Sequence, residues 1–129
     1  MDIKSKCDIQ IFAGDDSLLL PIMSIGGSGV ISVIGNIIPN DIYDIYSLYD
    51  EGKLSEARDK FYKYYNLIKG IFMETNPVPV KALLSYMNIF NNNTPRLPLI
   101  EMSDEKLLQL IKIYEKTQNK NNESIEIPI

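Results

Sequence analysis

Histidine and tryptophan are absent from this 129-residue chain, and cysteine occurs once, as Cys7. Without histidine, and with a single thiol, the chain cannot assemble a zinc site from the usual nitrogen and sulfur ligands. Carboxylate oxygens could still hold magnesium or calcium, but no pattern of acidic residues supports such a site. We therefore predict no metal and no cofactor. A lone cysteine also excludes a disulfide within the chain.

Clusters of basic residues and long apolar runs are also missing. The 13 lysines and arginines are spread over several segments and are outnumbered by 17 acidic residues, which gives a net charge of −4. This distribution provides no electrostatic footprint for nucleic acid or an anionic membrane. We find neither a secretory leader nor an apolar run that could cross a bilayer. The composition is typical of a soluble globular protein, and the cytoplasm is the simplest compartment.

The first third of the chain has the pattern of a strand, a helix and a second strand. Residues 9–13 form an apolar run that stops at a turn, where Asp15 or Asp16 can cap a helix. That helix would cover residues 18–25 and end at a glycine pair. Residues 30–34 are mostly β-branched, which is the pattern of a strand covered on both faces in a parallel sheet. Together these segments predict a βαβ unit.

The rest of the chain is predicted to be helical. Apolar residues recur at helical spacing in four segments, namely 39–51, 54–72, 79–90 and 103–118. Ser55 is placed to cap the second of these, and Asp104 and Glu105 suit the first turn of the last. Pro77 and Pro79 must interrupt the helical pattern, because each proline removes an amide donor and restricts the residue before it.

The predicted sheet is incomplete. Two parallel strands cannot have both faces and both edges covered by the helices available in this chain. Open edge amides invite pairing with strands from elsewhere. The helical part, in contrast, has enough amphipathic faces to pack on itself.

Four segments, in this order, carry a resemblance to a known family: Gly14-Asp15-Asp16; Gly26-Gly27-Ser28-Gly29-Val30-Ile31-Ser32-Val33 with Asn36 and Pro39; Glu74-Thr75-Asn76-Pro77-Val78-Pro79-Val80-Lys81-Ala82; and Arg96-Leu97-Pro98-Leu99. Each alone is a weak signal. Together they resemble the dihydrodipicolinate synthases, which are pyruvate-dependent lyases of the class I aldolase type. The similarity runs from about Cys7 to about Lys116.

The resemblance implies an α/β fold made of the last two βα units of a (β/α)8 TIM barrel, followed by a C-terminal helical appendage. The partial barrel, with strands seven and eight, would cover residues 1–52, the helical region 53–118, and a polar flexible tail 119–129. Enzymes on this barrel place their sites at the carboxyl ends of the strands. By resemblance, backbone at Gly14 and Ile31 lines the pyruvate pocket, and the Ile31 carbonyl faces the Schiff-base region.

The resemblance also implies that the catalytic groups lie elsewhere. In the family, the Schiff-base lysine belongs to the sixth strand, and the tyrosine and threonine that relay protons come from earlier strands. All of these would precede residue 1. We therefore assign no catalytic residue and expect the chain to be inactive alone. A chain carrying the N-terminal half-barrel, or a homo-oligomer, is the expected partner, and pyruvate would bind only in a completed barrel.

Other residues within the chain have alternative interpretations. Lys81 could be a reactive amine, but a local hydrogen bond or ion pair at a helix start is simpler, since reactive lysines are normally buried. Asp15 and Asp16 could form an acid/base or metal pair, although a turn and cap role is favoured. Cys7 has no histidine partner and is interpreted as a structural or incidental thiol. The eight tyrosines are interpreted as packing residues, because no basic patch accompanies them.

Two other hypotheses stay open for the chain as a whole. It could be a non-catalytic interaction module, in which the barrel remnant serves only as an oligomerisation surface. It could also be the product of a frameshifted gene or a misplaced start.

Overall fold

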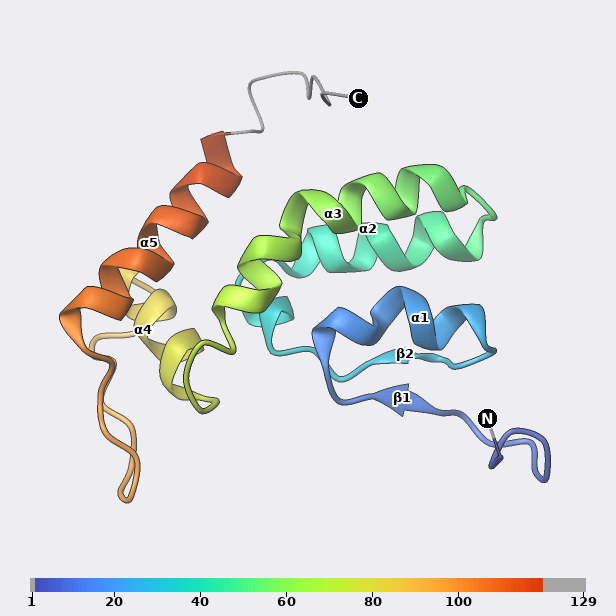
Figure 1. The fold of residues 1–129 in the computed structure, drawn as a ribbon, viewed down its shortest axis with the longest axis horizontal. Coiled ribbons are helices and arrows are strands. Elements are labelled where there is room, and N and C mark those ends of the chain that lie inside the picture. The colour runs from blue at the N-terminus through green and yellow to red at the C-terminus, as the bar shows by residue number, and fades with distance from the viewer. Residues whose placement is uncertain (1, 120–129) are drawn as a thin grey trace. The chain divides into compact units, whose positions relative to one another are not determined.

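The computed structural model describes residues 2–119, which fall into two compact units that divide between Ile68 and Lys69. Within these residues there are five α-helices and two β-strands (Figure 1). The chain is thus a partial α/β structure. Most of the predicted tail, residues 120–129, lies outside the described residues.

The first unit begins with a strand, a helical crossover and a second strand. Its elements are β1 (Phe12–Ala13), the 3-10 helix η1 (Asp16–Leu18), α1 (Leu19–Ser24), β2 (Gly29–Val30), the 3-10 helix η2 (Ile34–Asn36), α2 (Pro39–Asp50) and most of α3 (Leu54–Gly70). β1 and β2 pair in parallel, with Phe12 opposite Gly29. Figure 1 shows α1 running beside the two strands, as a βαβ crossover does. The predicted βαβ order is confirmed.

Both strands are shorter than the sequence predicts. The run at 9–13 contributes only two residues to the sheet, and the run at 30–34 is a strand only through Val30. The Ile31 amide still donates to the Ala13 carbonyl at 2.8 Å, but the amides of Val33 and Ile34 donate to the Asp16 side chain instead of β1. The prediction of a strand covered on both faces is wrong for Ile31, whose exposed fraction is 69%.

Of the two aspartates that follow β1, Asp15 is the one that caps the helical crossover. Asp15 caps η1, because its carboxylate accepts from the Ser17 amide at 2.8 Å and from the Ser17 hydroxyl at 2.6 Å. α1 then ends at Ser24, two residues before Gly26, whose φ of +83° is left-handed, as expected of a glycine that follows a helix.

Helices α2 and α3 match the predicted segments closely. α2 buries Ile45 completely, and α3 buries Ala57, Tyr64 and Leu67 on one stripe. The predicted capping role of Ser55 is wrong. Because α3 begins one residue earlier, Ser55 lies inside its first turn, where its hydroxyl accepts from the Arg58 guanidinium.

The second unit contains α4 (Val78–Tyr86) and α5 (Asp104–Asn119), which pack against each other. Leu83 and Leu110 are fully buried in this unit. The predicted helix over 79–90 is too long at its C-terminus. It ends near Met87, because Asn88 is left-handed with φ of +58° and the following amides turn back to the Leu84 carbonyl. Across residues 2–119, none of the helices has the length and apolarity to span a membrane.

Candidate functional site

The two turns singled out by the sequence lie at the same edge of the sheet. Gly14 follows β1 directly, and Ile31 follows β2 directly. Because β1 and β2 run in parallel, their carboxyl ends meet at one edge, and the bond from the Ile31 amide to the Ala13 carbonyl joins them there. Both residues are exposed at that edge. This is the edge at which barrel enzymes place their sites.

Gly14 leaves free space at this edge. A Cβ atom built on Gly14 would meet no heavy atom of the described residues within 4 Å. Gly27 is the opposite case, since a Cβ there would lie 2.7 Å from the Ile22 carbonyl oxygen. The fold of this chain therefore requires glycine at position 27, whereas at position 14 an alanine would fit.

A buried carboxylate ties the two turns together. Asp16 accepts hydrogen bonds from the Ser32 hydroxyl and from the amides of Val33 and Ile34, at 3.0 and 3.1 Å. The Ser32 oxygen in turn accepts from the Gly35 amide at 2.7 Å. The sequence favoured a turn and cap role for Asp15 and Asp16 over an acid/base or metal pair, and Ser32 was part of a resemblance segment without a role of its own. The signal that could have singled out Asp16 was the presence of two adjacent aspartates where one is enough to cap the helix.

Lys53 and Lys60 are poor candidates for a Schiff-base amine. Burial lowers the pKa of Lys60, but hydrogen bonds to Asp44 and Asp41 outweigh burial and raise it overall. The Lys60 amine lies 3.1 Å from the Asp41 carboxylate and 2.5 Å from that of Asp44. A hydrogen bond to Glu51 raises the pKa of Lys53. A Schiff-base amine needs a lowered pKa, so both lysines are shifted in the wrong direction.

Lys81 and Cys7 make local structural contacts. The Lys81 amine donates to the backbone carbonyl of Thr94 at 2.5 Å, and the Thr94 hydroxyl donates to Glu101 at 2.6 Å. Lys81, which lies in the third resemblance segment, is therefore bonded to the loop that precedes the fourth segment, inside the second unit. The exposed Cys7 thiol contacts the Ile3 carbonyl at 3.3 Å. Within residues 2–119, no group of three or more histidine, cysteine or acidic side chains could hold a metal ion.

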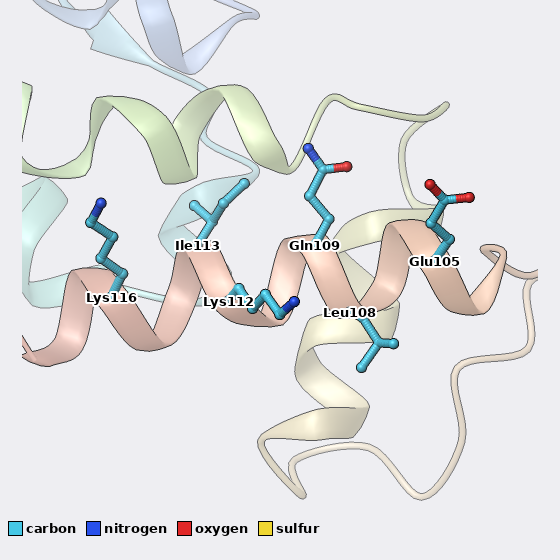
Figure 2. Close-up of a pocket in the computed structure, with 6 residues that line it drawn as sticks. All are labelled: Glu105, Leu108, Gln109, Lys112, Ile113 and Lys116. Atoms are coloured by element: carbon cyan, nitrogen blue, oxygen red, sulfur yellow. The ribbon is translucent and has the colours of Figure 1, made fainter.

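The second unit carries an open hollow of about 450 Å³ along α5. It is lined by six residues of that helix, Glu105, Leu108, Gln109, Lys112, Ile113 and Lys116. Figure 2 shows Glu105, Gln109, Ile113 and Lys116 projecting to one side of α5 and Leu108 to the other, and the polar ends are spread along the helix instead of meeting at one point. A ligand site needs convergent polar groups in a concave setting, and this face of α5 does not provide them.

Comparison with known proteins decides the family. The model of the dihydrodipicolinate synthetase family matches residues 1–117. The chain belongs to the dihydrodipicolinate synthetase family. A curated relative, the 4-hydroxy-tetrahydrodipicolinate synthase of Methanococcus aeolicus, is 44% identical over 109 residues. Those residues are 84% of this chain and 38% of that relative, so the chain spans well under half the length of the family member it matches.

Solved structures of the family share this fold. Dihydrodipicolinate synthase from Aquifex aeolicus superposes with a TM-score of 0.85 at 36% identity, over 90% of this chain and 40% of that one. The chloride-inhibited enzyme from Acinetobacter baumannii, which was solved in complex with pyruvate, has a TM-score of 0.80 at 27% identity. That superposition covers 85% of this chain and 38% of the enzyme.

Proposed function

We propose that this chain supplies the C-terminal part of a pyruvate-dependent lyase of the dihydrodipicolinate synthase type. In this proposal β1 and β2 are strands seven and eight of a (β/α)8 barrel, residues 1–52 form the partial barrel, and residues 53–118 form the helical appendage. The family match over residues 1–117, combined with coverage of only 38% of a relative's length, carries the proposal.

The open sheet supports this role. β1 and β2 form a two-stranded sheet with two residues in each strand, and Phe12 of β1 is 47% exposed. Ile31, which follows β2, and Ile9, which lies three residues before β1, are also exposed. Apolar side chains and unpaired strand edges are what neighbouring barrel strands would cover. The polypeptide that corresponds to the remaining length of the relatives is therefore the proposed partner of this surface.

We place the pyruvate pocket at the carboxyl edge of the sheet. Gly14 and Ile31 would line it with backbone groups, and the free space at Gly14 would leave room for the ligand. Pyruvate is present in the related Acinetobacter baumannii structure, which supports this substrate class. No residue of this chain is assigned a catalytic role. The family lysine, tyrosine and threonine would come from the polypeptide that completes the barrel.

Reconstitution tests the proposal. The chain is mixed with the N-terminal part of the Methanococcus aeolicus relative, which precedes the matched region. The measured activity is the reaction that the family resemblance implies, the condensation of pyruvate with aspartate semialdehyde. We expect a stoichiometric complex with activity, and no activity from either chain alone. A complex that binds but never condenses the two substrates would contradict the proposal, as would activity of this chain by itself.

A Gly14→Ala variant sharpens the test of the pocket. Because the added methyl group meets no described atom, the thermal unfolding of the isolated chain should be unchanged. In the reconstituted complex the same methyl would crowd pyruvate, and we expect the KM for pyruvate to rise about ten-fold. An unchanged KM would place the pocket away from Gly14.

The alternative is a non-catalytic oligomerisation module, which the same exposed apolar residues would also suit. A stable homo-oligomer that excludes the N-terminal part of the relative would favour it. The DNA upstream of Met1 separates these readings further. An in-frame strand ending in a lysine would indicate a longer lyase, a separate gene would indicate a split enzyme, and a frameshift would indicate a degenerate copy.

A further inference from the structure

Asp16 has a position that its neighbours do not explain. It is the first residue of η1, yet its exposed fraction is only 1%. The cap of η1 is already provided by Asp15, so the Asp16 carboxylate is available for other bonds. A buried carboxylate is costly unless hydrogen bonds compensate for the lost water. Here the compensation comes from residues 16 to 18 positions further along the chain.

These bonds hold the segment that follows β2. One oxygen of Asp16 accepts from the Ser32 hydroxyl, and the other accepts from the amides of Val33 and Ile34. The Ser32 hydroxyl oxygen also accepts a hydrogen bond from the Gly35 amide. On the other side, the Ile31 amide is held by Ala13. The Ile31 carbonyl therefore lies between an anchored amide and an anchored turn, and its direction is determined from both sides.

The chemistry of the bonds requires a carboxylate. All three donors point at Asp16, and an ionised carboxylate is an acceptor at both oxygens. An asparagine of the same shape would turn an NH₂ group toward either the two amides or the hydroxyl. Either the two amides or the Ser32 hydroxyl would then lose its acceptor at a buried or partly buried site, where an unsatisfied donor costs more than at an exposed one.

We propose that Asp16 is a positioning residue, whose carboxylate fixes residues 31–35 so that the Ile31 carbonyl is already oriented before the barrel is completed. The role of that carbonyl in the pyruvate pocket rests on the function proposed above, whereas the fixing of the turn does not. Because the turn is already ordered, less conformational entropy is lost when the rest of the barrel and the ligand bind.

The first test uses the full chain alone and compares two neighbouring isosteric changes. Amide hydrogen exchange is followed by NMR in the wild type, Asp16→Asn and Asp15→Asn. We expect the amides of Val33 and Ile34 to exchange about ten-fold faster in Asp16→Asn, because the side-chain amide either turns its NH₂ group toward them or accepts from them more weakly than a carboxylate does. Asp15→Asn should match the wild type, since asparagine caps a helix as well as aspartate does. Equal exchange in the two variants would overturn the proposal.

A second pair of variants covers the outcome in which Asp16→Asn does not fold. Ser32→Ala removes the hydroxyl that links Asp16 to the Gly35 amide, and Ser32→Thr keeps it. We expect faster exchange at Gly35 in the alanine variant and wild-type exchange in the threonine variant. Loss of protection in both, or in neither, would contradict a role for the hydroxyl link.

The reconstituted enzyme gives the readout that distinguishes positioning from simple stability. There we expect Asp16→Asn to raise the KM for pyruvate about ten-fold, with Asp15→Asn unchanged. Kinetics of Asp16→Asn that equal those of Asp15→Asn would overturn the link to the pocket. An inactive wild-type complex would instead refute the proposed function, and the exchange experiment would still decide whether Asp16 fixes the turn.

Discussion

The two adjacent aspartates Asp15 and Asp16 have different roles because their tertiary contacts differ. Asp15 and Asp16 are indistinguishable by residue type, and local rules predict a cap for either. One is an exposed cap and the other is buried under donors from a distant turn. The resemblance to the family placed Gly14 and Ile31 at one edge, beyond the carboxyl ends of two parallel strands. It could not assign Asp16, because its partners lie across a sheet contact.

Tyr64 is expected to give the chain a pH-dependent stability. Burial, and then a hydrogen bond to Asp41, raises the pKa of the Tyr64 phenol above its ordinary value. The folded chain therefore holds this proton more tightly than the unfolded chain. The contribution to stability is complete below about pH 10, where the unfolded tyrosine begins to ionise, and it is lost as the pH rises further.

Denaturant unfolding of Tyr64→Phe at neutral and alkaline pH checks this. We expect the variant to lack the alkaline loss of stability that Tyr64 contributes, so the difference between wild type and variant should change above about pH 10. Tyr62→Phe, which alters an exposed tyrosine on the same helix, serves as the control. A constant difference across the whole pH range would contradict the expected role of Tyr64.

At the scale of elements, helices were predicted better than strands. The helical period is repeated within each segment, so α2, α3 and α5 could be recognised from their own residues. Strand length depends on the partner amides, and at β2 the Asp16 carboxylate takes the amides that would have continued the ladder. Helix ends failed for a related reason. Asn88 adopts a left-handed conformation that ends α4, and the apolar residues around it had predicted that the helix continues.

The packing of α5 can be tested by two leucines on that helix. Leu110 is fully buried, and its Cδ1 would lie 3.2 Å from a Cβ built on Gly70, whereas Leu108 is 58% exposed. We expect Leu110→Ala to lower the free energy of unfolding by about 2 to 5 kcal/mol. Leu108→Ala should change it by less than about 0.5 kcal/mol. Similar losses in both variants, measured by urea unfolding, would mean that Leu110 is not the core residue of α5.

At the scale of the whole molecule, the family was recognisable from sequence, and the family model confirms it. Four short motifs in a fixed order sufficed, although each alone was a weak signal. The assignment of strands seven and eight, the pocket residues and the division at residue 52 remain predictions. They depend on strands that would lie beside β1 and β2, and the structure describes no further strand within residues 2–119.

The central claim is that this chain contributes pocket backbone but no Schiff-base amine. Pyruvate condenses with a lysine amine to give an imine and water, and borohydride reduces the imine to a stable secondary amine that mass spectrometry detects. With this chain, the N-terminal part of the relative and pyruvate together, the account predicts an adduct on the relative's polypeptide and none on any lysine of this chain. A reduced pyruvate adduct on this chain, alone or in the mixture, would contradict it.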